Sequence, residues 1–309
     1  MTSAPEALTH SEGRALVLAG AGAAGNAWEL GLIAGLAEGG VDVTRAEVVI
    51  GTSAGSTVAA QVTSGTPPGE LYTAVSTEVP RRADAAGRAG SAGSTRLPRG
   101  TTVSGPGYLE WSNAIIGSAS DPADMRRRLG AAALELDTSV GPDPSRWRDI
   151  VATRLPSHAW PPQEVRIVAV NARTGEPVVF DRHSGVDLVD AVAASTSAMT
   201  PYPIGGERYL NGGYRRSENA DLAMGFGRVL VMSPFSGRSR MPSGWGMDLA
   251  TQVAELRAGG STVEVLFPDA RSGDVFDANA LDPSTMPQAA RGGHVQGLEL
   301  AGQLVGFWG

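Results

Sequence analysis

The chain has 309 residues, of which 42% are hydrophobic and 18% charged, and its formal net charge is −7. This composition supplies a large core and excludes a disordered solvating chain, and the acidic balance argues against a nucleic-acid partner, which needs a concentrated basic face. All 25 basic side chains are arginine and there is no cysteine. A Schiff-base lysine, a P-loop lysine, a Ser-Lys dyad, a catalytic thiolate and a disulfide are therefore excluded.

The sequence shows neither a targeting signal nor a clear boundary between two domains. Residues 1–12 lack the basic and apolar regions of a secretory leader, and we expect them to form a disordered tail. No apolar run approaches the roughly 18 residues that suggest a membrane span. We expect a cytoplasmic protein in which residues 13–309 form a single α/β domain, with a Gly/Ser-rich insertion near 83–107.

Strands and helices alternate along the chain in the pattern of a mainly parallel sheet. A buried strand is predicted over 15–19, followed by a glycine-rich turn, a helix over 27–38, a strand over 48–50 and a helix through 58–62. Further strands are predicted over 165–170, 177–180, 208–210, 229–232 and 263–266. Further helices are predicted near 107–117, from 121, over 186–194, and at the C-terminus through 298–305.

The first glycine signature follows the first predicted strand. The run Gly20-Ala21-Gly22-Ala23-Ala24-Gly25 matches G-x-G-x-x-G, but 41 glycines make this pattern weak on its own. A dinucleotide site also requires an acidic residue about 20 positions further on, at the end of a strand. Asp42 has nearly that spacing, yet it precedes Val43-Thr44-Arg45 rather than ending a strand. The sequence therefore disfavours a nicotinamide or flavin site.

The second signature is Gly51-Thr52-Ser53-Ala54-Gly55, which matches G-x-S-x-G. The serine comes just after an apolar strand and just before a helix, as a nucleophile elbow requires. The alternative is that Ser53 only caps the helix that begins at Ala54. Local evidence alone leaves both interpretations open.

Together the two signatures favour acyl-transfer chemistry. A glycine-rich turn that opens a helix presents backbone N–H groups, and one such donor stabilises an oxyanion by about 3–4 kcal/mol. In a parallel sheet this turn and the serine turn lie at the same edge. We expect them to be neighbours.

Two downstream motifs complete a family resemblance. They are Ala193-Ala194-Ser195 before Pro201, and Asn211-Gly212-Gly213. From about Arg14 onward, the chain resembles the patatin-like phospholipase family. The resemblance implies a three-layer α/β/α sandwich with a mainly parallel central sheet, and a serine esterase site that uses a Ser–Asp dyad without histidine or cofactor. It assigns the nucleophile to Ser53, the dyad aspartate position to Asn211, the oxyanion loop to Gly20, Gly22, Ala23 and Gly25, and motif glycines to Gly51, Gly55, Gly212 and Gly213.

The chain departs from the family pattern at two positions. Ala24 stands where many members carry Arg or Lys, so the oxyanion hole would rely on backbone donors and a helix N-terminus. Asn211 stands where the dyad aspartate is expected, and a neutral amide cannot act as a general base, whose effect is typically 10²–10⁴-fold. Three explanations are open: a natural weak or inactive relative, a substitution made to trap substrate, or another acid such as Glu218 or Asp221.

A Ser-Asp-His triad is the remaining catalytic alternative. His294 is expected at a loop-to-helix junction, and His158 also follows Ser53 in chain order. The four histidines are scattered without the spacing of a zinc site, so we expect no metal.

The expected partner is an acyl ester or lipid-like substrate, with transient contact to a membrane surface. An apolar helix face from Tyr108 to Ile116 is interpreted as core or as a lid over an acyl pocket. The functional alternatives are a non-catalytic relative that binds an acyl ligand, and an acyltransferase in the same fold.

Overall fold

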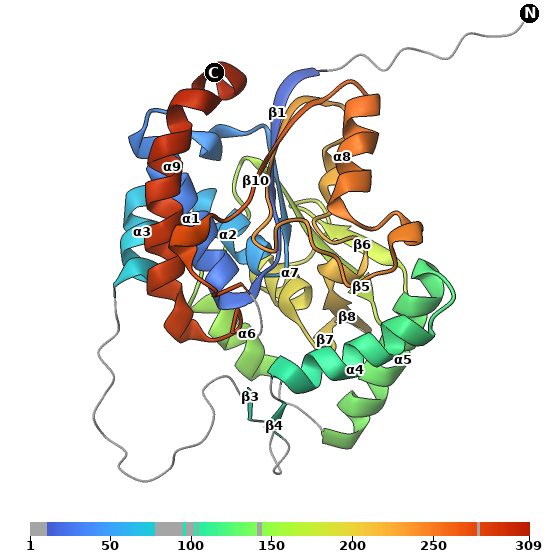
Figure 1. Ribbon diagram of the computed structural model, residues 1–309. Helices are drawn as coiled ribbons and strands as arrows, with labels where there is room; N and C mark the ends of the chain where they lie inside the picture. The colour runs from blue at the N-terminus through green and yellow to red at the C-terminus, as the bar shows by residue number, and fades with distance from the viewer. Residues whose placement is uncertain (1–10, 78–94, 97–101, 104, 141–143, 277–278) are drawn as a thin grey trace, which may run out of the picture.

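Eight strands of the computed structural model form one mixed sheet with helices on both faces (Figure 1). The structure describes residues 11–77, 95–96, 102–103, 105–140, 144–276 and 279–309. The strands are β1 (Ser11–Leu18), β2 (Val48–Thr52), β5 (Glu164–Asn171), β6 (Pro177–Phe180), β7 (Tyr202–Ile204), β8 (Glu207–Asn211), β9 (Phe226–Met232) and β10 (Thr262–Leu266). Strands β10, β9, β1, β2 and β5 are parallel neighbours in that order, whereas β6 and β8 pair with β5, and β7 with β8, in the antiparallel sense.

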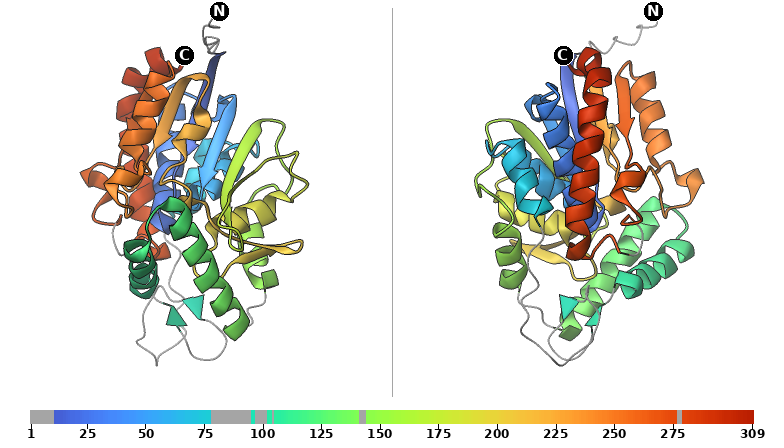
Figure 2. Two further views of the ribbon diagram at one scale, coloured as in Figure 1. Left: turned by 90° about the vertical axis from the view of Figure 1, so that its right-hand side faces the viewer. Right: turned by 60° about the vertical axis from the view of Figure 1, so that its left-hand side comes forward.

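The helices make the outer layers of a three-layer α/β/α sandwich. They are α1 (Gly22–Glu38), α2 (Ala54–Val62), α3 (Pro68–Ser76), α4 (Gly105–Ser118), α5 (Pro122–Val140), α6 (Pro144–Ala152), α7 (Leu188–Thr196), α8 (Leu249–Ala258) and α9 (Met286–Trp308). Side chains of α1, α2, α3, α7 and α9 share one apolar cluster, and α8 covers the other face of the sheet (Figure 1). Helices α4 and α5 lie at the end of the molecule opposite to the C-terminus (Figure 2).

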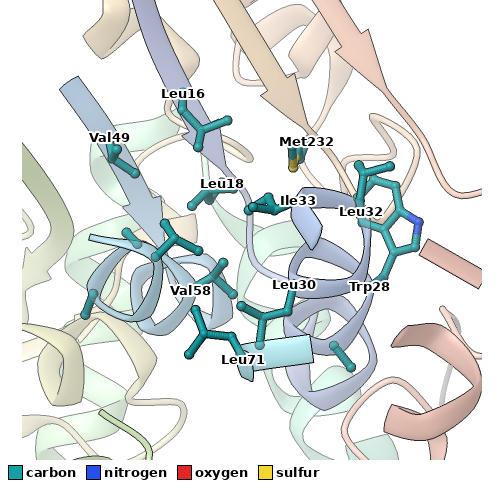
Figure 3. Close-up of a cluster of buried hydrophobic side chains, with 14 of the residues drawn as sticks. Leu16, Leu18, Trp28, Leu30, Leu32, Ile33, Val49, Val58, Leu71 and Met232 are labelled. Carbon is teal, nitrogen blue, oxygen red and sulfur yellow. The ribbon is translucent and has the colours of Figure 1, made fainter. Parts of the chain in front are cut away.

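Successive side chains of the central strands belong in turn to the two apolar clusters, one on each face of the sheet. Leu16 and Leu18 of β1 belong to the cluster on the α1 side, together with Ile33 (Figure 3), while Ala15 and Val17 belong to the cluster on the α8 side. Because helices cover both faces, the central strands are continuous apolar runs, which is why they were predictable.

One edge of β5 pairs with two strands in succession. Thr52, the last residue of β2, pairs with Val168, and Asn211, the last residue of β8, pairs with Ala169. Strand β6 pairs with both of these β5 residues and therefore occupies the opposite edge. The end of β2 and the end of β8 consequently meet on one edge of β5, which brings Ser53 next to Asn211.

Helices α1 and α9 are in direct backbone contact. Two glycines from each helix form the contact: Gly31 and Gly35 from α1, and Gly293 and Gly297 from α9. A Cβ atom added at any of the four would overlap a backbone carbonyl oxygen of the other helix. The position of α1, whose first turn is the predicted oxyanion loop, is thereby fixed against the C-terminal helix.

The predicted strands are all confirmed, with ends that differ by up to four residues. The predicted helices are also present, although α1 begins five residues earlier than expected, at Gly22. The short strand β7 and helices α3, α6 and α8 were not predicted. In α3 only Leu71 is buried, so that helix carries almost no apolar pattern to detect.

The expected tail and insertion fall largely outside the described residues. Of the tail (1–12), Ser11 and Glu12 already belong to β1. Within the segment predicted as a loop (83–107), the structure describes an antiparallel pair of two-residue strands, β3 (Thr95–Arg96) and β4 (Thr102–Val103), and the start of α4. Strands this short leave no periodicity in the sequence.

Glu29 of α1 is a fully buried carboxyl group. Within the described residues, neither of its side-chain oxygens has a hydrogen-bond partner. Burial raises the pKa of Glu29 well above its usual range, and the nearby Ala19 amide opposes that rise only in part. Burial therefore favours the neutral, protonated form of this carboxyl group.

We expect Gly35→Ala to lower the free energy of unfolding by about 1–3 kcal/mol, because the new methyl group would force α1 and α9 apart. Gly302→Ala is the matched control: it lies on α9, and an added Cβ there meets no described atom within 4 Å. The control should be neutral or stabilising by about 0.5–1 kcal/mol. Urea unfolding followed by circular dichroism measures both, and equal stabilities would contradict the backbone contact.

Glu29→Gln should stabilise the protein increasingly as pH rises. A carboxyl whose pKa is raised by folding contributes its full stability below the unfolded pKa of about 4.3 and loses it as pH rises toward the folded pKa. Glutamine does not ionise, so the difference in melting temperature between variant and parent should grow from pH 5 to pH 9. Glu264→Gln, at an exposed position of β10, should give a flat difference, and a flat profile for Glu29→Gln would refute the buried neutral acid.

Candidate active site

Ser53 lies at the turn between β2 and α2 in a strained backbone conformation. Its φ is 54° and its ψ is −123°, a region that costs a non-glycine residue about 1–3 kcal/mol. Ser53 stands at the N-cap position of α2, but among the described residues its side chain makes no capping hydrogen bond. The hydroxyl therefore does not serve as the helix cap that the sequence also allowed.

The glycine at the end of the G-x-S-x-G motif allows α2 to start directly beneath β1. A Cβ atom added at Gly55 would overlap the backbone carbonyl of Leu18. At the start of the motif, a Cβ atom on Gly51 would lie 2.6 Å from the Cα atom of Ser56. The small residues of the motif are thus required for the tight turn that exposes Ser53.

The predicted oxyanion loop packs against the serine. A Cβ atom added at Gly20 would lie 2.6 Å from Cβ and 3.2 Å from Oγ of Ser53, so the loop backbone is within contact distance of the hydroxyl. Gly22, with φ 59°, and Ala23 open α1. The first amides of a helix have no intrahelical acceptors, so this end presents N–H donors and the positive end of the helix dipole.

Two other amides of the loop are already engaged. The N–H of Ala24 donates to the carbonyl of Ala280 (3.0 Å), and the N–H of Gly25 donates to the carbonyl of Ala21 (2.9 Å). These bonds hold the loop in shape from both sides. Gly25, although part of the predicted loop, has its amide committed within the turn.

Asn211 is hydrogen-bonded to Ser53. Its Nδ2 lies 2.9 Å from Ser53 Oγ, and its Oδ1 accepts from the N–H of Gly213 at 2.9 Å. Gly212 follows directly, and its Cα lies so close to Val168 that a Cβ atom would overlap the carbonyl oxygen there. The motif Asn-Gly-Gly thus places residue 211 next to Ser53.

The direction of the Asn211–Ser53 hydrogen bond matters chemically. Because the Gly213 N–H requires an acceptor, the amide oxygen of Asn211 faces it and the NH₂ group faces Ser53. Asn211 therefore donates to Oγ, whereas a dyad aspartate would accept its proton. The two side chains are within hydrogen-bond distance, but the group that faces Ser53 is a donor and not a base.

Ser195 is a site residue whose role the sequence did not indicate. Its Oγ accepts the backbone N–H of Ser53 at 2.9 Å, and the residue is fully buried at the end of α7. The Ala-Ala-Ser motif therefore supports the strained turn. No local sequence signal reveals this role, because the two residues are 142 positions apart.

Neither Glu218 nor Asp221, the alternative acids, makes a hydrogen bond to Ser53 in the described part of the chain. The carboxylate of Glu218 accepts from Ser217 Oγ and from Ser233 Oγ (2.9 Å), and burial raises its pKa. Burial also acts to raise the pKa of Asp221, but hydrogen bonds and charge from Arg215 hold it below the usual value. Both carboxyls are committed to partners other than Ser53.

The expected position of His294 at a loop-to-helix junction is wrong. His294 lies inside α9, where its Nε2 is 2.9 Å from Glu38 and its ring stacks on Tyr72 at 4.5 Å. Glu38 ends α1, about 24 Å along the helix from Gly22 at 1.5 Å per residue. A triad with Ser53 is therefore excluded for His294.

The other histidines also lie in other settings. His158 Nε2 is 3.0 Å from the carbonyl oxygen of Ala152. His183 lies in an exposed turn, where its backbone N–H donates to Asp181 Oδ1. His10 is outside the described residues. Among the described residues, no histidine makes a hydrogen bond to Ser53.

Asp42 does not occupy the position of a ribose-binding acid. It accepts from the N–H and the hydroxyl of Thr44 (3.1 and 2.6 Å) and caps a 3-10 turn, Val43–Arg45. The strand that follows, β2, ends at Thr52, directly before the serine. The strand end at which a dinucleotide site needs an acidic residue is instead followed by the Ser53 turn.

Two further observations concern metals and membranes. Across the residues that the structure describes, no three His, Asp or Glu side chains gather as metal ligands would. In the same part of the chain, no helix combines the length and apolar character needed to cross a bilayer.

Comparison with known proteins places this architecture in a family. The model of the patatin-like phospholipase family matches residues 16–224, which contain the glycine-rich loop, Ser53 and Asn211. No curated protein matches the chain. Among solved structures, the crystal structure of VipD from Legionella pneumophila is similar, with 14% sequence identity and a TM-score of 0.46 over 95% of this chain and 67% of that one. The family match covers more than half of the chain, and the protein therefore belongs to the patatin-like phospholipase family of lipid acyl hydrolases.

Proposed function

We propose that this protein is a serine acyl hydrolase acting on acyl esters of the lipid class, with Ser53 as its nucleophile and residue 211 as the dyad partner. The observation that carries the proposal is the 2.9 Å contact between Ser53 Oγ and the side chain of Asn211, beside the glycine loop that opens α1. The strained turn at Ser53 supports the same role, since strain of this kind clusters at active sites.

In the proposed reaction, Ser53 Oγ attacks the acyl carbonyl carbon and the carbonyl oxygen becomes an oxyanion. The amides of Gly22 and Ala23, at the N-terminus of α1, are the proposed donors to that oxyanion. The alcohol then leaves with a proton, and water hydrolyses the acyl-serine to release the acid and free Ser53. Every step besides oxyanion stabilisation requires proton transfer.

Asn211 limits the rate of the proposed reaction because it cannot take part in proton transfer. The amide holds the Ser53 rotamer by donating to Oγ, but it cannot take the hydroxyl proton. We propose that the chain is an attenuated hydrolase in which solvent replaces the missing base. Aspartate at the same position would accept from both Ser53 and the Gly213 amide without a change of shape.

Contact with a lipid surface is part of the proposal. Leu281 is 50% exposed and lies against the oxyanion loop, since a Cβ atom on Gly22 would be 2.7 Å from its side chain. Phe267 is 41% exposed and directly follows β10, so it lies at the carboxyl ends of the parallel strands. Exposed apolar side chains at this end of the sheet suit a substrate that is presented by a membrane or micelle.

A second candidate function is binding without turnover. The reversed hydrogen bond from Asn211 to Ser53 favours it, because the strained serine turn and the glycine-rich loop are retained while the base is missing. An acyltransferase would use the same Ser53 chemistry with an acceptor other than water. A covalent probe of Ser53 and product analysis separate these functions.

The variant Asn211→Asp should hydrolyse an activated ester such as p-nitrophenyl butyrate at least about 10²-fold faster than the parent chain, because general-base assistance is restored. The rate of the variant should fall on the acid side only, as one carboxyl near or above its ordinary pKa of about 3.9 becomes protonated. No limb from a histidine near 6.5 should appear.

Two variants in the aspartate background act as controls. Ser53→Ala should remove the gain, since nucleophile and base act as a unit. His294→Ala should keep it, because His294 pairs with Glu38 far from the site. An unchanged rate in Asn211→Asp, together with loss of activity in His294→Ala, would overturn the dyad.

A fluorophosphonate probe should label Asn211→Asp rapidly and the parent chain at least about 10-fold more slowly, because the attack on phosphorus also needs a base. Labelling should map to Ser53 by peptide mass spectrometry and disappear in Ser53→Ala. Absence of labelling in both the parent chain and Asn211→Asp would favour the binding protein over the hydrolase.

A further inference from the structure

Asn219 is a buried side chain that links the two halves of the site. It is fully buried and adopts a left-handed conformation, with φ 59° and ψ 31°. Asparagine is one of the few residues other than glycine that tolerate this region. Its side chain enters the space between the end of β2 and the turn that follows β8.

The amide nitrogen of Asn219 makes both connections. Nδ2 donates to Thr52 Oγ1 at 3.0 Å and to the carbonyl of Gly212 at 3.1 Å. Thr52 directly precedes Ser53, and Gly212 directly follows Asn211. One NH₂ group therefore holds the neighbours of the two residues whose separation decides proton transfer.

The orientation of this amide is set by charged neighbours. Arg215 donates to Asn219 Oδ1 at 2.9 Å and makes a two-pronged ion pair with Asp221, at 2.9 and 2.6 Å. Because the guanidinium can only donate, Oδ1 must face it and Nδ2 must face Thr52 and Gly212. Thr52 is held from a second side, since its hydroxyl donates to the carbonyl of Glu218 at 3.3 Å.

We propose that Asn219 is a positioning residue that fixes the distance between Ser53 and residue 211. This inference rests on the proposed function, in which those two side chains are the dyad. Asn219 touches neither reacting atom and acts through Thr52 and Gly212. A displacement of about 1 Å in such a site is enough to reduce turnover about 10²-fold.

Two substitutions test Asn219 in the Asn211→Asp background. Asn219→Asp keeps the size and the bond to Arg215 but removes both donors, and Asn219→Gly removes the side chain while tolerating the left-handed backbone. Both should lower kcat on p-nitrophenyl butyrate about 10- to 100-fold and change KM less than about 3-fold. A purely structural role would instead lower the amount of folded enzyme and leave kcat per folded molecule unchanged.

A double-mutant cycle with Thr52→Val isolates the connection. Valine keeps the shape of threonine and removes the acceptor of the Asn219 bond. If the connection runs through this bond, the double variant should lose no more than about 3-fold beyond the worse single variant. Losses that multiply would overturn the connection through Thr52.

Asn171→Asp is the matched control. Asn171 uses its amide in a turn, with Nδ2 to Glu207 (3.1 Å) and Oδ1 accepting from Arg173 and Thr174. It should change stability without changing kcat. An equal loss of kcat in Asn171→Asp and Asn219→Asp would refute a specific positioning role.

A measurement independent of activity keeps the two proposals separable. Hydrogen exchange of the parent chain should become faster in the peptides around 50–54 and 210–214 together when Asn219 is changed to Gly, and in neither for Asn171→Asp. If Asn211→Asp is inactive, the proposed function fails while this exchange result still tests the connection. Unchanged exchange in both peptides would overturn it.

Discussion

The site depends on the pairing of one strand edge. Strand β5 pairs through residue 168 with β2 and from residue 169 with β8, on the same edge. The parallel partner β2 and the antiparallel partner β8 end at adjacent residues of β5, so their C-terminal ends meet. A shift of one residue in either register would turn the side chain of Ser53 or Asn211 to the other side of the sheet. Backbone hydrogen bonds therefore bring the two residues to one place, and the side chains of Ser195 and Asn219 then hold the turns on which they lie.

Sequence patterns were sufficient for elements whose signal is local. Buried strands such as Val229–Met232 are apolar runs, and the turns at Gly20 and Ser53 carry glycines at fixed spacing. These features predicted the sheet, the helices that follow the first two strands, and the neighbourhood of the two turns. Helix α8 was not predicted, because one of the positions on its buried face is the polar residue Gln252, which weakens the apolar pattern.

Contacts between residues far apart in the chain could not be predicted from sequence patterns. Ser195 supports Ser53 across 142 positions, and Asn219 reaches Thr52 across 167. A polar residue in such a role looks like any loop residue until the fold brings its partner to it. His294 shows the opposite case, since Arg291-Gly292-Gly293 looks like a loop but its glycines are needed for helix packing.

The contact between α1 and α9 has a consequence for how the chain can be divided. The family match ends at residue 224, yet β1, an inner strand of the sheet, pairs on one side with β9, which begins at Phe226. The carbonyl of Ala280 also accepts the amide of Ala24 in the glycine-rich loop, and α9 packs on the helix that this loop begins. A fragment cut at the boundary of the match would leave a central strand with an open edge and the loop without its outer support. The structural unit that surrounds Ser53 therefore extends through the C-terminal helix, and the part of the chain beyond the family match supports the glycine-rich loop beside this serine.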